Sequence, residues 1–173
     1  MKRALILALA GGALAAGALW GQGAVPRPAP ELKIAQGSGE IARLSSYRGR
    51  IVLLAFISTQ CVHCQKASKV FEQLGREYAG KLQVVEVAFD EGADVAAFKK
   101  RFGLTFPVGI STSDAVHAFL GIPPGARLGT PQVVAIDRAG VIRAQSEQFG
   151  TPILQTAEYL RSLLNAMLGG SAH

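Results

Sequence analysis

Both cysteines of this 173-residue chain stand in one short segment, Cys61-Val62-His63-Cys64. Shortly before it, the seven residues 51–57 are all apolar and rich in β-branched types, which is typical of a strand buried on both faces of a sheet. After it, apolar side chains recur at steps of three and four, as on one face of a helix. These side chains belong to Ala67, Val70, Phe71, Leu74 and Tyr78. The pattern therefore predicts a buried strand, then Cys61, then a helix.

This position gives the two thiols different chemistry. Unpaired N–H groups and the macrodipole at a helix N-terminus stabilise a thiolate, so Cys61 is predicted to be the exposed nucleophile. Cys64 lies one turn later on the same side, close enough for a redox-active Cys61–Cys64 disulfide, and would resolve a mixed disulfide from the more buried side. His63 could hydrogen-bond the thiolate or add positive charge, and either effect would lower the pKa of Cys61.

Other interpretations of the cysteine pair are weaker. A zinc site usually needs four protein ligands, and besides His63 the chain offers only His117 and His173, so we expect no metal and no other cofactor. A purely structural disulfide that closes so short a loop would stabilise the fold little. The alternative for His63 is a solvated helix residue. The hydroxyls of Ser58 and Thr59 are expected to cap the helix.

The N-terminal segment has the pattern of an export signal. Met1-Lys2-Arg3 is basic, and residues 4–20 carry no charge, a length at the lower edge of a membrane span. We predict a signal peptide or membrane anchor at 1–23, a linker at 24–30, one domain at 31–168 and a flexible tail at 169–173. The protein is then exported, periplasmic or extracytoplasmic, and a signal that stays uncut would hold it at the inner membrane. Disulfides persist outside the cytosol, so two cysteines in one motif indicate a working redox pair.

Composition and charge exclude other classes. The formal net charge is +6, but no dense Lys/Arg cluster alternates with aromatic residues, so nucleic-acid binding is not supported. The remaining length suits a single domain with its own core. We expect a monomer.

The rest of the chain predicts an α/β sandwich around a mixed sheet. A hairpin is expected at 32–44, strands at 82–89, 106–110, 133–136 and 141–144, and helices at 93–102, 114–120 and 151–168. Ile153 and Leu160 are expected on the inner face of the last helix. Pro131, at the start of a strand, cannot donate to a sheet and is a candidate for a cis peptide bond beside the cysteines.

With these motifs in place, residues 31–168 resemble the thioredoxin superfamily and, within it, the exported TlpA/ResA-like thiol–disulfide oxidoreductases. The resemblance rests on residues 44–57, the Cys61–Cys64 motif, an αβ insert at 93–110 and the segment 129–140. It implies a thioredoxin-like sandwich, a mixed central β-sheet flanked by helices. It also implies that Cys61 attacks, that Cys64 resolves, and that Pro131 shapes a substrate groove.

The resemblance further suggests how substrate binds. Thr130 would pair its backbone with an extended substrate segment. Gln60 stands directly before the first cysteine, where the family usually has Trp, and we assign it to substrate binding.

Three departures from the family pattern concern carboxylates and the helix. Ala67 replaces a common Glu, Lys69 replaces a helix-kinking Pro, and Ala55 stands where thioredoxins keep a buried Asp. Glu86 could substitute for the missing acids, although we interpret a mid-strand Glu as a residue at a sheet edge.

The function predicted from these features is exchange of disulfides with protein substrates through a mixed disulfide on Cys61. The resemblance implies partners with thiols or disulfides, apocytochrome c during cytochrome c maturation among them, and a membrane-bound redox partner. The alternative is a thiol peroxidase: Ser58 and Cys61 match part of the peroxiredoxin pattern, but Leu54 stands where that pattern has Pro. A third candidate is a Cu(I)-binding metallochaperone, which no methionine cluster supports.

Overall fold

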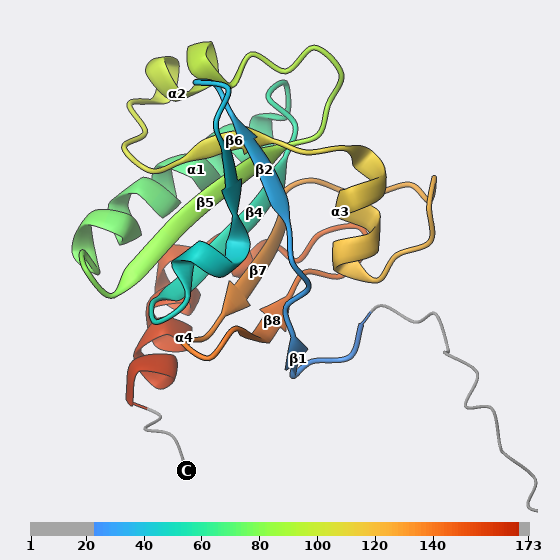
Figure 1. Cartoon of the computed structure of the whole chain (residues 1–173). Coiled ribbons are helices and arrows are strands. Elements are labelled where there is room, and N and C mark those ends of the chain that lie inside the picture. Colours follow the sequence, from blue (N-terminus) through green and yellow to red (C-terminus); the bar gives the residue numbers. More distant parts are fainter. Residues whose placement is uncertain (1–22, 170–173) are drawn as a thin grey trace, which may run out of the picture.

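One eight-stranded sheet organises the computed structural model, which describes residues 23–169 (Figure 1). The strands are β1 (Arg27–Pro28), β2 (Lys33–Gln36), β3 (Ile41–Arg43), β4 (Ile51–Ile57), β5 (Leu82–Ala88), β6 (Val108–Ile110), β7 (Gln132–Ile136) and β8 (Val141–Gln145). The helices are α1 (Val62–Glu77), α2 (Val95–Phe102), α3 (Ser113–Leu120) and α4 (Ala157–Gly169), with 3-10 turns η1 (Leu44–Tyr47) and η2 (Pro152–Gln155). The strand order is β1-β8-β7-β4-β5-β6-β2-β3.

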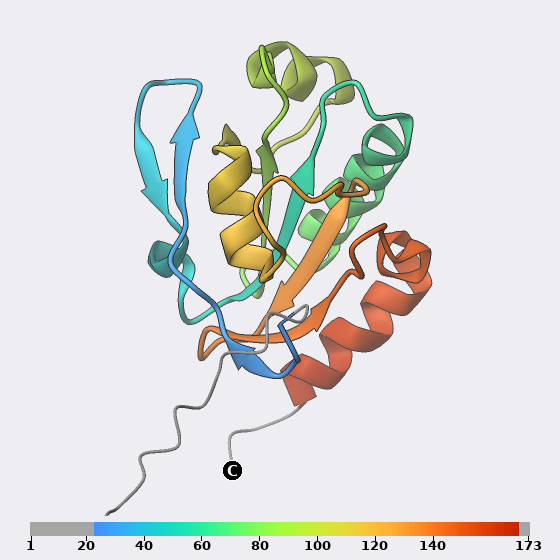
Figure 2. The ribbon, with the colours of Figure 1, turned by 90° about the vertical axis from the view of Figure 1, so that its right-hand side faces the viewer.

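Strand β4 lies at the centre because it can be buried on both faces. All seven of its residues are buried, and it pairs in parallel with β5 and antiparallel with β7. Helices α1 and α4 cover one face of the sheet and α3 covers the other, as Figure 2 shows. The predicted thioredoxin-like sandwich with a mixed sheet is therefore confirmed, and α2 with β6 forms the predicted insert.

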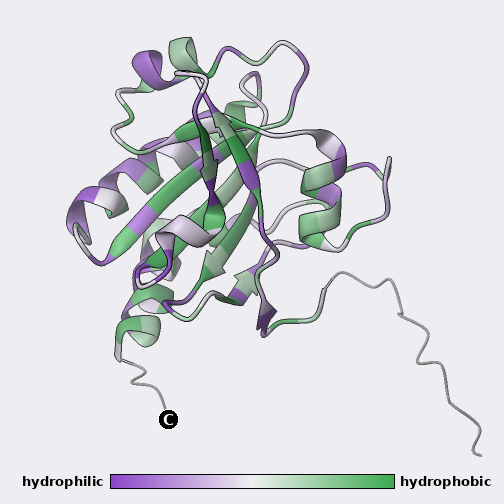
Figure 3. Cartoon of the chain, viewed as in Figure 1, coloured by the Kyte–Doolittle hydropathy of each residue, from purple (hydrophilic) through white to green (hydrophobic). Residues whose placement is uncertain are grey.

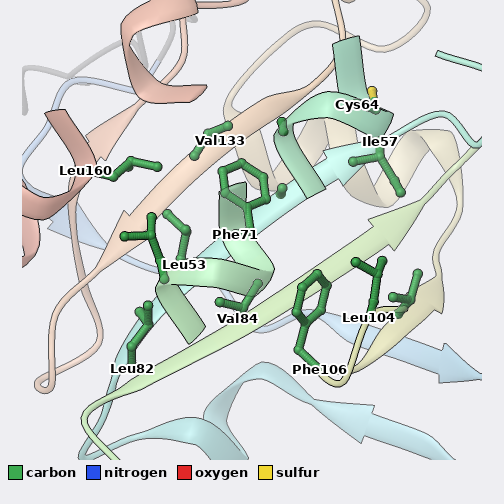
Figure 4. Close-up of a cluster of buried hydrophobic side chains, with 14 of the residues drawn as sticks. Leu53, Ile57, Cys64, Phe71, Leu82, Val84, Leu104, Phe106, Val133 and Leu160 are labelled. Atoms are coloured by element: carbon green, nitrogen blue, oxygen red, sulfur yellow. The ribbon is translucent and has the colours of Figure 1, made fainter. Parts of the chain in front are cut away.

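The hydrophobic effect holds these layers together through two buried clusters, one on each face of the sheet. On the α1 face, Phe71 lies at the centre of a cluster that receives Leu53 from β4 and Leu160 from α4 (Figure 4). On the α3 face, the ring of Phe119 packs edge-on against Phe56 of β4, with 5.3 Å between ring centroids. Figure 3 shows that apolar residues gather on the central strands.

The N-terminal part of the domain differs from the prediction. Arg27 and Pro28, expected in a linker, form the short strand β1 beside β8. The reason is the Arg27 guanidinium, which donates to the carbonyl oxygen of Phe119 at 2.9 Å and to Oε1 of Gln145 at 2.7 Å. These bonds fasten the segment to the sheet edge.

The predicted last helix is also wrong at its beginning. Pro152 starts the 3-10 turn η2, and Thr156 is extended, so the α4 helix begins only at Ala157. The break resets the helical periodicity. Leu154 is consequently buried, whereas Ile153, expected to point inward, is 51% exposed.

The predicted signal or anchor at 1–23 lies outside the described residues except for Gly23, and so do residues 170–173 of the predicted tail. Gly169 is the last residue of α4. Between residues 23 and 169, none of the helices combines the length and the apolar character that crossing a membrane requires.

Candidate functional site

The two cysteines lie at the beginning of α1, in different surroundings. Cys61 is the N-cap residue, and its sulfur accepts a hydrogen bond from the backbone N–H of Cys64 at 3.3 Å. Cys61 is partly exposed, whereas the side chain of Cys64 is fully buried among the apolar residues of the α1 face (Figure 4). Both thiols are free.

These surroundings move the two thiol pKa values in opposite directions. Partial burial raises the pKa of Cys61, but hydrogen bonds with Cys64, with Thr130 and with the backbone of His63 outweigh it, so the net pKa lies below the ordinary thiol value. For Cys64, burial is the largest cause and raises the pKa far above that value, and its contact with Cys61 raises it further. Cys61 is therefore the sulfur that ionises first.

Thr130 and Pro131 lie beside the cysteines, although they are far away in the sequence. The Thr130–Pro131 peptide bond is cis. The thiol of Cys61 lies 3.5 Å from the carbonyl oxygen of Thr130. Pro131 is buried and Thr130 is half-buried, and the strand β7 follows at Gln132.

The turn before Cys61 is held by a carboxylate that the sequence analysis did not single out. Asp90, just after β5, accepts hydrogen bonds from the backbone N–H of Thr59 and from its hydroxyl at 2.6 Å. The expectation that Thr59 and Ser58 cap α1 is wrong, because Asp90 engages Thr59 and the Cys61 sulfur itself takes the cap position. An acid directly after a buried strand, at the same sheet end as the cysteines, was the available signal.

A second missed residue, Gln132, joins the two loops around the cis-proline. Its buried side-chain amide donates to the carbonyl oxygens of Gly129 at 2.7 Å, Glu147 at 2.9 Å and Gln148 at 3.1 Å. The loops are packed so closely that a Cβ at Gly129 would lie 2.5 Å from the carbonyl oxygen of Phe149. Phe149, on the loop next to Gly129, is itself 76% exposed. Nothing in the local sequence pattern marks Gln132 or Phe149 as part of the site.

The side chains of His63, Gln60 and Val62 face solvent around Cys61. Within the described part of the chain, the His63 ring makes no hydrogen bond, so its predicted effect on Cys61 stays a prediction. The same holds for the assignment of Gln60 to substrate binding.

Glu86 does not lie at a sheet edge, so that interpretation is wrong. It occupies the middle of β5, between β4 and β6, and its side chain is completely buried under α1. The α1 residue Ser68 gives it a polar partner, with 2.7 Å between the hydroxyl oxygen and Oε1 of Glu86. A mid-strand acid is tolerated there because the helix supplies that partner.

Metal ligands are sparse around this site. Among residues 23–169, no group of three or more His, Cys, Asp or Glu side chains is arranged to hold a metal ion. The chemistry that the arrangement offers is that of two neighbouring sulfurs with different acidity.

Comparison with known proteins shows which family and which relatives the chain resembles. A model of the AhpC/TSA family matches residues 25–145. The thioredoxin-like protein YneN of Bacillus subtilis is 33% identical over 119 residues, which is 66% of this chain and 66% of that protein. The thiol-disulfide oxidoreductase ResA of Geobacillus thermodenitrificans is 31% identical over 122 residues, 69% of this chain and 67% of that one. This chain thus aligns with about two thirds of the length of these relatives.

A solved structure agrees with these sequence matches. A candidate thiol:disulfide interchange protein DsbE of Chlorobium tepidum superposes with a TM-score of 0.68 at 26% identity, over 83% of this chain and 97% of that one. The predicted resemblance to the thioredoxin-like thiol–disulfide oxidoreductases is thereby confirmed at the level of family and fold. The chain belongs to the AhpC/TSA family, and its sequence, fold and paired cysteines are those of a thioredoxin-like oxidoreductase.

Proposed function

We propose that the protein is an exported thiol–disulfide oxidoreductase that exchanges disulfides with protein substrates through a mixed disulfide on Cys61. The observation that carries the proposal is the contrast between the two thiols, one accessible and acidic, the other buried and weakly acidic. Disulfide exchange needs this contrast, because one thiolate must attack first and the other must wait until the adduct has formed.

The exchange runs in two steps when the protein reduces a substrate. The Cys61 thiolate attacks one sulfur of the substrate disulfide, and the other substrate sulfur leaves and takes up a proton. Cys64 then gives its proton to solvent and attacks Cys61, so that the Cys61–Cys64 disulfide forms and the second substrate thiolate leaves. Two electrons pass from the protein to the substrate, and oxidation of a substrate dithiol is the reverse sequence.

The cis-proline loop offers a place for the substrate backbone. The carbonyl oxygen of Thr130 faces Cys61, and an extended substrate segment that pairs with Thr130 would bring its sulfur to the attacking thiol. Gln60 and His63 are exposed and stand on either side of Cys61 in the sequence. We assign Gln60 to contact with the substrate and His63 to tuning of the thiolate. Protein thiols and disulfides, apocytochrome c among them, and a membrane-bound redox partner are the proposed reaction partners.

Trapping the intermediate tests this proposal. In the full chain, Cys64→Ser should retain a mixed disulfide with a protein substrate that carries scrambled disulfides, because the Cys61 thiolate can attack a substrate disulfide but the resolving thiol is absent. Cys61→Ser is the matched control and should trap nothing. If both variants trap equal amounts, or neither traps any, Cys61 is not the attacking thiol and the proposal fails.

The reduction potential of the wild-type pair in glutathione buffers then assigns the direction of electron flow. A value of about −120 to −180 mV marks an oxidant or isomerase, and a value below about −230 mV marks a reductant.

The peroxidase alternative predicts instead that hydrogen peroxide converts Cys61 to a sulfenic acid faster than oxidised glutathione reacts with it. The copper alternative predicts Cu(I) binding that Cys64→Ser abolishes.

A further inference from the structure

A buried carboxyl group lies close to the resolving cysteine and takes no part in the two steps of the exchange. Glu86 is 0% exposed, and its neighbours across the sheet are Ala55 of β4 and Val108 of β6, both apolar. Within residues 23–169, its only polar side-chain partner is Ser68, one helical turn after Cys64 on α1. The second carboxyl oxygen, Oε2, has no hydrogen-bond partner among the described residues.

The hydrogen bonds that Ser68 can form depend on whether the carboxyl group of Glu86 is protonated. The Ser68 hydroxyl oxygen lies 2.8 Å from the carbonyl oxygen of Cys64 and 2.7 Å from Oε1 of Glu86. A hydroxyl carries one proton, and a backbone carbonyl can only accept. If Ser68 donates to Cys64, the second contact is a hydrogen bond only when Glu86 donates, which requires its carboxyl group to be protonated.

We infer that Glu86 is a positioning residue, held as the neutral carboxylic acid, which donates to Ser68 so that Ser68 can hold the backbone carbonyl of Cys64. Through this chain of contacts, the protonation of a residue in the sheet is linked to the position and ionisation of the resolving thiol. The inference concerns the same site as the proposed function and rests on it where Cys64 is called the resolving thiol.

The charged groups around Glu86 favour the neutral form. In residues 23–169, no Lys, Arg or His forms an ion pair with it. On α1, the titratable groups that share its side of the helix are Cys64 and Glu72, and the facing strand positions are the apolar residues Ala55 and Val108. Glu72 is ionised, because hydrogen bonds from Thr105 and Arg76 outweigh its partial burial and keep its pKa below the ordinary value. Burial raises the pKa of Glu86 to about 8.

This linkage has a consequence for the exchange reaction. Resolution requires a thiolate at Cys64, and an ionised Glu86 would place a second negative charge in the same poorly hydrated space. Loss of the Glu86 proton also removes the donor to Ser68, whose single proton must then serve two acceptors. Resolution by Cys64 should therefore gain less from rising pH once Glu86 ionises than it would beside a neutral residue.

Infrared spectroscopy tests the protonation directly. The reduced full-length protein should show the carbonyl band of a protonated carboxylic acid at neutral pH, sensitive to deuterium exchange and lost in a titration with its midpoint near pH 8. Glu86→Gln should lack the band. Glu72→Gln, a buried acid on the same helix, is the matched control and should keep it. Ser68→Ala should shift the band without removing it, which tests the contact even if Glu86→Gln does not fold.

Kinetics with glutathione test the link to Cys64. The glutathione adduct on Cys61 is formed with oxidised glutathione, and its resolution rate is followed from pH 6 to 10. The wild type and Glu72→Gln should show a shallower rise above the titration of Glu86, and Glu86→Gln should lose this inflexion.

Each result has a defined meaning. If the wild type lacks the carboxylic acid band, or Glu86→Gln retains it, the neutral-acid assignment is overturned. Superimposable rate profiles for the wild type and Glu86→Gln overturn the positioning role. Absence of any glutathione adduct on Cys61 overturns the proposed function and the link to it, whereas the infrared result still decides the protonation of Glu86.

Discussion

The surroundings of Cys61 and Cys64 differ more than three residues of separation would suggest. Around Cys61, polar contacts from Asp90, Gln132 and Thr130 hold three loops in place and leave the sulfur accessible. Around Cys64, the α1 face of the sheet supplies a packed apolar environment in which Glu86 is the buried acid of β5. The same thiol group thus becomes more acidic or less acidic according to its surroundings, and the start of α1 places one cysteine in each region.

The largest expected effect is on alkylation of the two thiols. In the reduced wild type, iodoacetamide should modify Cys61 at least about a hundredfold faster than Cys64 at neutral pH, because the thiolate is the reactive form and Cys64 is both buried and weakly acidic. Mass spectrometry of the two peptides measures both rates. Equal alkylation rates of Cys61 and Cys64 in the folded protein would contradict the predicted difference between the two thiols. As a control, both cysteines should react at equal rates in urea.

The pH dependence of stability tests the Cys64 region. Because the folded-state pKa of Glu86 is raised to about 8, the unfolded chain releases this proton at lower pH than the folded one does. The stability linked to this proton is complete below the pKa of an unfolded Glu and falls as pH rises toward 8. Urea unfolding should therefore show that the wild type loses about 3 kcal/mol more than Glu86→Gln between pH 5 and pH 8.

Two controls sharpen this second prediction. Glu72→Gln should follow the wild-type pH dependence, because the pKa of Glu72 is lowered instead of raised. If the free energies of unfolding of the wild type and of Glu86→Gln change in parallel with pH, Glu86 has the same pKa in the folded protein as in the unfolded chain, and the prediction fails.

Removing the amide that joins the loops tests the Cys61 region. Gln132→Leu leaves the carbonyl oxygen of Gly129 without a side-chain donor and loosens the cis-proline loop, so a loss of about 2 kcal/mol is expected in urea unfolding. Its adduct formation with oxidised glutathione should also slow. Gln148→Leu, which removes one exposed bond to the carbonyl oxygen of Arg127, is the control and should change little.

The smallest effect concerns the exposed ring beside the cis-proline loop. Phe149→Ser should raise the KM for an unfolded protein substrate about threefold, because part of an apolar contact is lost, and should leave the reaction with glutathione unchanged. Ile41→Ser, on the edge strand β3 and 61% exposed, is the control. A similar change of KM in both variants would show that Phe149 makes no specific contact with the substrate.

Local patterns predicted much of the fold. The apolar run at 51–57 coincides with β4, because a strand buried on both faces leaves an unbroken apolar sequence. The helical spacing after Cys61 predicted α1 for the same kind of reason. The last helix and the N-terminal linker were predicted less well, because a proline-initiated turn and the long-range bonds of Arg27 decide them.

The sequence by itself determined the pairing of the two cysteines in one motif, their place at the start of a helix and the class of sheet, since these depend on spacing and on hydrophobic periodicity. The tertiary structure decided which polar residues support them. Asp90 lies 31 positions from Thr59, Glu147 lies 15 positions from Gln132, and Glu86 lies 18 positions from Ser68, yet a hydrogen bond joins each pair. Burial and hydrogen bonding act through distance in space, so a glutamate that looks like an edge residue in the sequence becomes, under α1, a buried acid behind Cys64.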